Sequence, residues 1–445
     1  MRRFLFLILC LLALPSDAAA QELSHRAVHR ALDARIRQSA VFADGHTGFA
    51  LYDLDAERPV FGYQASRYFV PASNTKLVTF LVANRLLSDG APAIYYRDTA
   101  GRTELWGSGY PLLGHPAFVG YDSLQAWLQG RGNPLTLHFP AAEELPRYGA
   151  GWSWDDYPFG YVFERTALPV YGNRLYLDLR PGPDGRETPF ATPPSVAEKL
   201  VRDPQQERTI SRREGSNQFT VGPGLDRRTA YPVQRALTMD TAATVAFLRE
   251  ALPGVSVGSG TAPRPADADS LRVRIPDTLY RSLLLDSDNF LAEQLVLLAA
   301  SARYGSPDEE RLFTWVTDTL FREMELGEVS YRDGSGLTRY NLLRPAQLVE
   351  IVAALDREVG RDRLLTFLPA GGVSGTLRNR FANRPEPYVW AKTGTLTGVI
   401  AVSGLLRTAS GRWLAFSFLH NNVMGSSRDY YAEMEEVLDW IRANL

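Results

Sequence analysis

The sequence predicts an α+β fold in which helices flank an antiparallel sheet and a long β-rich region is inserted into the chain. Strand-like segments lie near both ends of the chain with helical segments between them, a pattern typical of one sheet covered by helices. From about 93 to 277 the pattern changes to short strands and turns rich in glycine and proline. The 445 residues suffice for two or three domains of about 150 residues each. We therefore predict one domain formed by 21–92 and 278–445, with 93–277 inserted into it.

The first twenty residues have the features of a secretory signal peptide. Arg2 and Arg3 precede an apolar run from Phe4 to Leu14, and Ala18-Ala19-Ala20 offers a small-residue cleavage site. The run is shorter than the roughly 20 residues that span a bilayer, and an uncleaved anchor is the alternative. We expect a signal peptide at 1–20, a protein secreted across the inner membrane into the periplasm, and at most peripheral membrane contact.

The segments after this leader alternate between helical and strand patterns. Glu22–Arg37 has the apolar spacing of an amphipathic helix, and two strands joined by a polar turn follow it. After Pro71, a helix from Ser73 to Leu87 carries apolar residues around most of its surface and should be buried. The inserted region has one clear helix, capped by Asp240 and ended by Pro253-Gly254. The two strands are predicted at Thr47–Leu54 and Pro59–Tyr63.

Helical patterns return after about 278 and give way to strands near the C-terminus. Phe290–Arg303 is strongly apolar. The string Ser306-Pro307-Asp308-Glu309 supplies an N-cap, a first-position proline and a capping-box glutamate for the next helix, which Gly327 closes. Another helix follows Pro345, and a last amphipathic helix ends the chain. The three predicted C-terminal strands are Tyr388–Thr393, Gly398–Leu406 and Trp413–His420.

The composition argues against several functional classes. The formal charge of −2 becomes −3 when the leader, with two arginines and one aspartate, is removed. A near-neutral balance without basic blocks argues against nucleic acid as a partner. Cys10 is the only cysteine and lies in the leader, so the mature chain has no disulfide and no cysteine-bound metal. We interpret His25 and His29, which have helical i,i+4 spacing, as a solvated helix face rather than a metal site, and expect no metal or cofactor.

Lysine is nearly absent from this chain, which uses arginine for positive charge. Of the 48 basic residues only three are lysines, namely Lys76, Lys199 and Lys392. A desolvated lysine can lose its proton and act as a base, whereas arginine stays protonated at ordinary pH. We interpret Lys199 as an exposed charge of the inserted region. The other two lysines lie in strings with chemical meaning.

The string Ser73-Asn74-Thr75-Lys76 combines a hydroxyl with an amine. Three residues of helix place Ser73 and Lys76 on one face, about 5–6 Å apart at their β-carbons. A neutral lysine can take the serine proton, and burial and a nearby cation such as Lys392 would each lower its pKa. The helix N-terminus at Ser73 also presents free backbone N–H groups to an oxyanion. A serine three residues before a lysine also arises by chance, so this string is weak alone.

Two further strings follow in the chain. Ser287-Asp288-Asn289 offers a hydroxyl for proton relay and an amide for substrate binding, and it also fits a polar turn or a helix cap. Lys392-Thr393-Gly394-Thr395 lies in a strand pattern, where its glycine allows a ligand backbone to approach and its lysine and hydroxyls suit a carboxylate. It also fits a solvated strand end. The three strings together, in this order, make coincidence a poor explanation.

Longer strings around these residues resemble a known family. The three short strings have the order found in the penicillin-recognising serine acyl-transferases. The longer ones resemble the class C low-molecular-mass penicillin-binding proteins, the type-4 D-alanyl-D-alanine carboxypeptidase/endopeptidase family, over nearly the whole mature chain. A long insert between the first two motifs is a mark of this family and distinguishes it from class A β-lactamases. The strings are Trp152–Asp156, Leu285–Glu293, Asp333–Asn341 and Leu368–Gly372.

The resemblance implies a penicillin-recognising, β-lactamase/transpeptidase-like fold in which 21–92 and 278–445 form the catalytic domain and 93–277 forms two subdomains. It implies that Ser73 is the nucleophile and Lys76 the base, with Ser287 and Asn289 as proton relay and substrate amide ligand. The substrate carboxylate would be held by Lys392, Thr393, Gly394 and Thr395. Backbone N–H groups of Ser73 and Thr395 would form the oxyanion hole.

The resemblance also implies a pocket for the free end of a diaminopimelate side chain. Asp156 and Arg339 match that pocket, while Thr397 stands where some relatives carry glutamine. The implied function is a serine D,D-peptidase of peptidoglycan stem peptides, inhibited covalently by β-lactam antibiotics. A serine β-lactamase and a catalytically idle wall-binding scaffold are the alternatives. The absence of a Glu-x-x-x-Asn string at a suitable distance after Ser287 argues against a class A β-lactamase.

Overall fold

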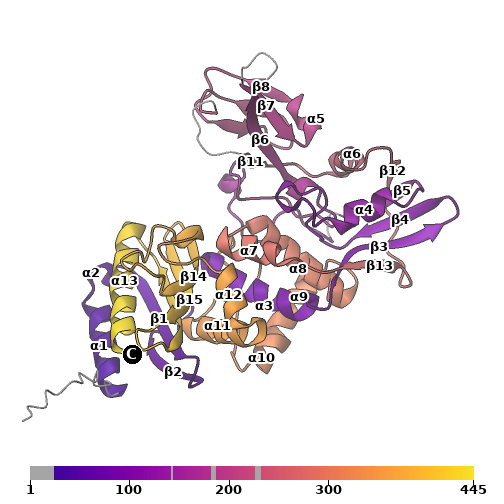
Figure 1. The fold of residues 1–445 in the computed structure, drawn as a ribbon. Helices are drawn as coiled ribbons and strands as arrows, with labels where there is room; N and C mark the ends of the chain where they lie inside the picture. The colour runs from indigo at the N-terminus through magenta and orange to yellow at the C-terminus, as the bar shows by residue number, and fades with distance from the viewer. Residues whose placement is uncertain (1–24, 142–143, 182–186, 226–231) are drawn as a thin grey trace, which may run out of the picture.

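The computed structural model describes residues 25–141, 144–181, 187–225 and 232–445. The predicted signal peptide and the first residues of the predicted N-terminal helix lie outside these ranges. Two regions are seen side by side in Figure 1. One holds the first described helix and the C-terminus, and the other holds most of the residues between about 91 and 275.

A five-stranded sheet is the centre of the first region. Its strands are β1 (His46–Asp53), β2 (Arg58–Tyr63), β14 (Val389–Leu396), β15 (Val399–Arg407) and β16 (Trp413–Asn421). They lie in the order β14-β15-β16-β1-β2, and every neighbouring pair is antiparallel. Strands from opposite ends of the chain therefore pair, with His46 facing Asn421. The five predicted strands are confirmed, and β14 and β2 are the two edge strands.

Helices cover both faces of this sheet, because its strand residues alternate between two apolar clusters. Phe49 and Leu51 point to the side of α1 (His25–Gln38) and α13 (Ser427–Asn444). Ala50 and Tyr52 point to the opposite cluster, which contains residues of α11 (Pro345–Val359). Figure 1 shows α1 and α13 together on one side of the strands.

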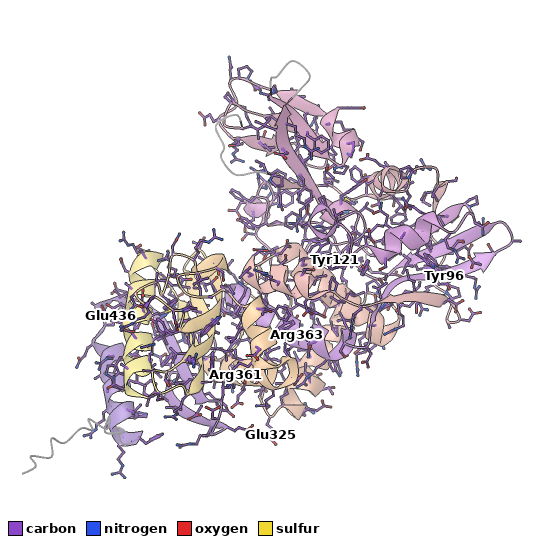
Figure 2. The ribbon with its side chains drawn as sticks, viewed as in Figure 1. Tyr96, Tyr121, Glu325, Arg361, Arg363 and Glu436 are labelled. Atoms are coloured by element: carbon purple, nitrogen blue, oxygen red, sulfur yellow. The ribbon has the colours of Figure 1, made fainter. Side chains whose placement is uncertain are left out.

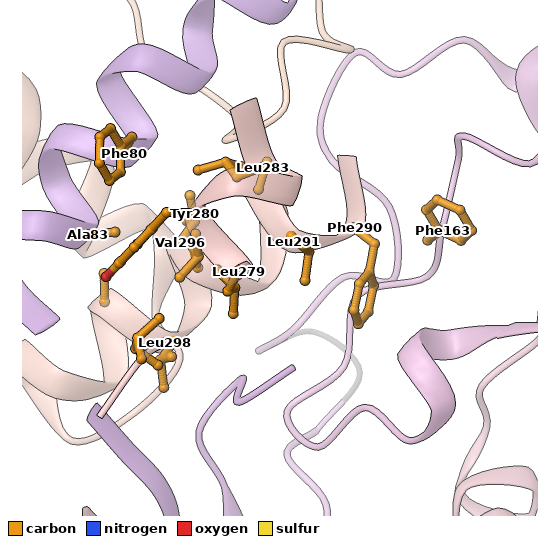
Figure 3. Close-up of a cluster of buried hydrophobic side chains, with 14 of the residues drawn as sticks. Phe80, Ala83, Phe163, Leu279, Tyr280, Leu283, Phe290, Leu291, Val296 and Leu298 are labelled. Carbon is orange, nitrogen blue, oxygen red and sulfur yellow. The ribbon is translucent and has the colours of Figure 1, made fainter. Parts of the chain in front are cut away.

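The helix that follows Ser73 and carries Lys76 is deeply buried. A 3₁₀ turn at Ala72–Asn74 leads into α3 (Thr75–Leu87), and ten of the 13 residues of α3 are buried, as predicted. It packs against α7 (Asp277–Leu285) and α8 (Asn289–Tyr304). Figure 3 shows this contact, in which the rings of Phe80 and Tyr280 lie 5.0 Å apart at their centroids. The same figure shows Phe163, from the inserted segment, beside Phe290 of α8.

The described residues of the second region form three sheets. A mixed sheet has the order β12-β5-β4-β3-β13, and two three-stranded sheets have the orders β11-β6-β7 and β8-β10-β9. Their strands are β3 (Ala91–Thr99), β4 (Arg102–Gly107), β5 (Leu135–His138), β6 (Arg174–Pro181), β7 (Glu187–Thr192), β8 (Leu200–Arg202), β9 (Ile210–Arg212), β10 (Phe219–Val221), β11 (Val233–Ala236), β12 (Val257–Gly260) and β13 (Asp269–Val273). Figure 1 shows β6, β7 and β8 at the end remote from the five-stranded sheet.

The helices differ from the sequence prediction in three respects. The inserted region contains α4 (Ser123–Gln129) and α5 (Pro194–Ala197) besides the predicted α6 (Thr241–Ala251). The helix predicted to be capped by Ser306 begins later, at α9 (Glu309–Trp315), because the side chain of Asp308 accepts the N–H of Arg311. It continues through a π-helical turn, Val316–Leu320, into α10 (Phe321–Glu323).

A further short helix, like α4 and α5, was absent from the prediction. It is α12 (Arg361–Phe367), which follows α11 directly. Arg363, labelled in Figure 2, fixes this helix to α7 through a hydrogen bond of 2.6 Å to Asp277. Among the described residues, none of the helices combines the length and apolar character needed to cross a bilayer. In the same residues, no cluster of three or more histidine, cysteine or acidic side chains is arranged to hold a metal ion.

Candidate active site

Ser73 lies in the tight turn that precedes α3. Ala72 has a φ of 47°, a left-handed conformation that costs an L-residue roughly 1–2 kcal/mol, and such strain is often found at functional sites. Gly394 of β14 lies against this turn, because a Cβ there would come within 2.9 Å of the Ser73 backbone nitrogen. The turn therefore rests on the edge strand, where a half-buried Ser73 meets the third predicted string.

The amine of Lys76 is fully buried and contacts the Ser73 hydroxyl. Its Nζ lies 3.1 Å from Ser73 Oγ, 2.7 Å from Asn289 Oδ1 and 2.6 Å from the backbone oxygen of Ser335. The last two atoms are carbonyl oxygens and can only accept. A neutral amine has two N–H bonds and one lone pair, so donation to the two carbonyls leaves the lone pair for the Ser73 hydroxyl proton. This arrangement fits a general base.

The burial of Lys76 explains how its amine can become neutral. Burial lowers the pKa of Lys76 from 10.5 to about 8, against the opposing charges of Asp333, Glu293 and Asp288. Lys392 is also completely buried, and burial followed by the charge of Lys76 holds its pKa well below 10.5. Of the two causes considered from the sequence, burial lowers the pKa of Lys76, and the charge of Lys392 is not among the causes of that shift.

The second string forms the corner between α7 and α8. Asp288 caps α8 by accepting the Leu291 N–H at 3.0 Å and pairs with Arg174 of the inserted region at 2.9 Å. Burial would raise the pKa of Asp288, but the charge and hydrogen bond of Arg174 together with the Leu291 N–H lower it. Ser287 has a φ of 60°. This corner aims Asn289 at Lys76, and Ser287 and Asn289 border one cavity of about 330 Å³.

The third string lies on the edge strand. Lys392 Nζ donates to the Thr393 carbonyl at 2.7 Å, and Thr393 Oγ1 donates to Thr376 Oγ1 at the same distance. Gly394 is buried against the Ser73 turn, while Thr395 is exposed. The predicted carboxylate ligands therefore follow one another along β14, beside the nucleophile.

A loop at Asp333–Thr338 completes the wall behind Lys76. Asp333 is fully buried, and its carboxylate accepts the N–H groups of Gly336 and Thr338, each at 2.8 Å. Gly336 has a φ of 82°, and a Cβ there would lie 1.9 Å from the Ala72 oxygen. The loop therefore locks onto the turn that carries Ser73.

The inserted region supplies part of the site. Trp152 Nε1 donates to Asp333 Oδ2 at 2.9 Å, so the predicted Trp-x-Trp string docks on this loop. Tyr161 joins two predicted residues, because its hydroxyl donates to Asp156 at 2.6 Å and its carbonyl accepts from Asn289 Nδ2 at 2.9 Å. Arg339 is exposed and donates to the Thr397 carbonyl at 2.7 Å. In the described ranges, Asp156 and Arg339 form no ion pair with each other.

The sequence of this chain is similar to those of known peptidases. Residues 140–444 match the D-Ala-D-Ala carboxypeptidase 3 (S13) family. The D-alanyl-D-alanine carboxypeptidase DacB of Haemophilus influenzae is 30% identical over 410 residues, which cover 83% of this chain and 84% of the relative. The chain belongs to the S13 family. The resemblance to the type-4 penicillin-binding proteins is thereby confirmed, and the chain is a serine-type peptidase of the D-Ala-D-Ala carboxypeptidase family.

A more distant relative and two solved structures are also similar to this chain. The D-alanyl-D-alanine carboxypeptidase of Actinomadura sp. (strain R39) is 26% identical over 428 residues, which cover 85% of this chain and 78% of the relative. The crystal structure of penicillin-binding protein 4 from Haemophilus influenzae matches with a TM-score of 0.67 and 18% identity, covering 93% of this chain and 98% of that one. The same protein complexed with a β-lactam gives a TM-score of 0.62. The penicillin-recognising fold is therefore confirmed.

Sequence reasoning missed several residues of this S13-family site. Asp333, Ser335 and Glu293 lie in strings that carried the resemblance, but only Arg339 in the Asp333–Asn341 string was given a role. Tyr161 was not singled out. The strings contained these carboxylates, and a buried carboxylate needs a hydrogen-bond donor. Which groups donate to them could be seen only in the folded structure.

Proposed function

We propose that this protein is a serine D,D-peptidase that cleaves peptidoglycan stem peptides after D-alanine through an acyl-enzyme on Ser73. It would release terminal D-alanine as a carboxypeptidase, open D,D-crosslinks as an endopeptidase, or do both. The observation that carries the proposal is the Lys76 amine, held by two carbonyl oxygens with Ser73 Oγ as its third neighbour. Family membership supports the reaction class.

In the proposed acylation, Ser73 Oγ forms a bond to the carbonyl carbon of the penultimate D-alanine while its proton passes to Lys76. The peptide C–N bond then breaks, and the leaving amine takes up a proton by way of Lys76 and Ser287. Backbone N–H groups of Ser73 and Thr395 would stabilise the oxyanion. Water then attacks the ester and regenerates the Ser73 hydroxyl.

Lys392 has a proposed role that depends on the substrate. A terminal carboxylate bound beside Lys392, Thr393 and Thr395 would favour the protonated form of Lys392, whose pKa is lowered in the free protein by burial and by Lys76. A protonated Lys392 would in turn favour the neutral form of Lys76. Substrate binding would thereby promote the basic state of the catalytic amine.

We also propose that Asp156 and Arg339 select diaminopimelate-type side chains. Asp156 accepts a hydrogen bond from Tyr161, whose carbonyl contacts Asn289. Arg339 donates to the carbonyl of Thr397, which follows β14, so the two opposite charges lie on segments that border the site. An ammonium and a carboxylate on one carbon centre would suit that pair of charges. Thr397 offers its backbone oxygen to Arg339, whatever its side chain.

The remaining proposals concern location and domain division. We propose a periplasmic protein with 1–20 as signal peptide, at most peripheral contact with the membrane and no nucleic acid partner. We propose a catalytic domain from 21–92 and 278–445, and two subdomains within 93–277. The separate mixed sheet and the two three-stranded sheets support the second division.

The test is product analysis on a purified crosslinked muropeptide. Mass spectrometry should show loss of D-alanine, separation of the crosslinked halves, or both, and Ser73→Ala should abolish every product. Fluorescent penicillin should label the mature protein and not the Ser73→Ala variant, with slow release of the label. Rapid β-lactam hydrolysis without muropeptide products would indicate a β-lactamase, and an unlabelled wild type would indicate an idle scaffold.

A further inference from the structure

Glu293 is a buried carboxyl group behind the site that the proposed reaction steps do not use. It lies on α8 one helical turn after Asn289 and is 2% exposed. Its Oε1 accepts the backbone N–H groups of Gly334 at 3.1 Å and Ser335 at 2.7 Å. The carbonyl of Ser335 is the atom that accepts from Lys76 at 2.6 Å. One carboxyl oxygen thus holds the residue whose carbonyl contacts the base.

We propose that Glu293 is a positioning residue for the catalytic base, fixing the loop Asp333–Thr338 so that the Ser335 carbonyl directs one N–H of Lys76 and leaves its lone pair to Ser73. The inference rests on the proposed function of Ser73 and Lys76. It adds a residue that touches neither substrate nor the reacting atoms.

The Asp333–Thr338 loop contacts α8 and α3 at several points, and the Glu293 carboxyl group lies among these contacts. Gly334 lies directly on α8, since a Cβ there would come within 2.6 Å of the Ala292 oxygen. The Gly334 carbonyl accepts from Thr79 Oγ1 at 2.6 Å. Thr79 and Lys76 are three residues apart on α3, so successive carbonyls of the loop bind successive positions on one helix face. Loss of the Glu293 acceptor would leave two buried N–H groups unpaired next to this contact.

The charges around Glu293 come from both regions of the molecule. Arg165 of the inserted region lies 3.6 Å from Oε2 and also pairs with Glu309 of α9. Burial and the charge of Asp333 raise the pKa of Glu293 to about 8, against the opposing Arg165. Both causes favour the protonated form of Glu293. Both the acid and the carboxylate keep an oxygen that can accept the two N–H groups, so the positioning role holds in either state.

Two variants of equal length separate the acceptor from the volume of the side chain. Glu293→Gln keeps an oxygen that can accept both N–H groups, whereas Glu293→Met fills the same space without one. We expect Glu293→Met to lower the acylation rate constant for a chromogenic β-lactam by about 10- to 100-fold, since a displacement of about 1 Å at a catalytic group can cost about 10²-fold. The dissociation constant of the non-covalent complex should not change. Glu293→Gln should stay within about threefold of wild type.

Glu164→Met is the matched control. Glu164 is also 2% exposed and accepts a backbone N–H, from Met239 at 2.8 Å, but it lies in the inserted region away from Lys76. It should lose thermal stability without a change in acylation rate. Equal impairment of Glu293→Gln and Glu293→Met, or a Glu293→Met that acylates within about twofold of wild type, would overturn the inference. A wild type that the β-lactam does not acylate would instead refute the proposed function.

Discussion

At the scale of single residues, the scarcity of lysine was the most informative signal. The sequence predicted that Ser73 and Lys76 share a helix face, and the contact of 3.1 Å agrees. Lys199 is exposed, also as predicted. Burial was predicted as a cause of the lowered pKa of Lys76, but the opposing charges of Asp333 and Glu293 could not be predicted, because they come close to Lys76 only in the folded chain.

The three lysines predict three different responses to arginine substitution. Lys76→Arg keeps a positive charge but cannot accept a proton, so acylation should slow by at least about 10²-fold. Lys199→Arg should match wild type, and Lys392→Arg should fall between the two, because a guanidinium attracts a carboxylate but does not fit the buried site. The measurement is the second-order acylation rate with a chromogenic β-lactam, with thermal melting as the folding control. Near-wild-type acylation by Lys76→Arg would exclude Lys76 as the base.

The lowered pKa of Lys76 predicts that, as the pH rises, acylation becomes faster and the destabilisation caused by burying the Lys76 amine becomes smaller. Acylation should rise with pH up to about 8, where Lys76 becomes neutral. Between about 8 and 10.5 the unfolded chain holds a proton on Lys76 that the folded chain lacks, so stability rises with pH across that window. Lys76→Met has no such amine. Its gain in melting temperature over wild type should be largest below pH 8 and shrink as the pH approaches 10.5. A gain independent of pH would contradict this account.

At the scale of elements, the long and strongly patterned segments were predictable and the short ones were not. The five strands of the central sheet and α3, α8, α11 and α13 follow from alternation and helical spacing. The short helices α4, α5 and α12 offer too few turns for a period to emerge. Asp308 rather than Ser306 caps α9, and since both residue types are good caps, the sequence alone does not decide between them.

Two glycines with similar backbone angles test the contact between the Asp333–Thr338 loop and the Ser73 turn. Gly336 has a φ of 82° and would place a Cβ 1.9 Å from the Ala72 oxygen, whereas Gly411 has a φ of 92° and no neighbour within 4 Å. Gly411→Ala should cost roughly 1–2 kcal/mol of stability and leave acylation unchanged. Gly336→Ala should cost more and strongly reduce acylation. Chemical denaturation and acylation rates check both. Equal effects of the two substitutions would show that the loop contact is dispensable.

At the scale of the whole molecule, the inserted region takes part in the site. Trp152, Tyr161, Arg165 and Arg174 reach respectively Asp333, Asn289, Glu293 and Asp288 of the other region. The sequence predicted an insert and, by resemblance, a role for Asp156. It could not predict these contacts, because they join segments more than 100 positions apart.

This interface predicts a selective effect on substrates. Asp156→Ala and Arg339→Ala should impair cleavage of peptides with a diaminopimelate side chain, because each removes one charge partner, and should spare acylation by simple penicillin. Asp155→Ala, an exposed neighbour, is the control. Steady-state rates on the peptide and acylation rates with penicillin should be measured in parallel. Equal losses on both would mean that the two residues are structural.

The pairing of β1 with β16 means that the enzyme can become active only after its C-terminal strands are present. The β1–β2 hairpin is made early, yet its neighbour β16 and the edge strand β14 are synthesised long after it. Contacts between such distant segments form late, since a long loop must be closed before they contribute stability. A chain that stops before Val389 carries the serine and its base but lacks β14, on which the Ser73 turn rests. Copies that end before β14 should therefore lack acylation activity.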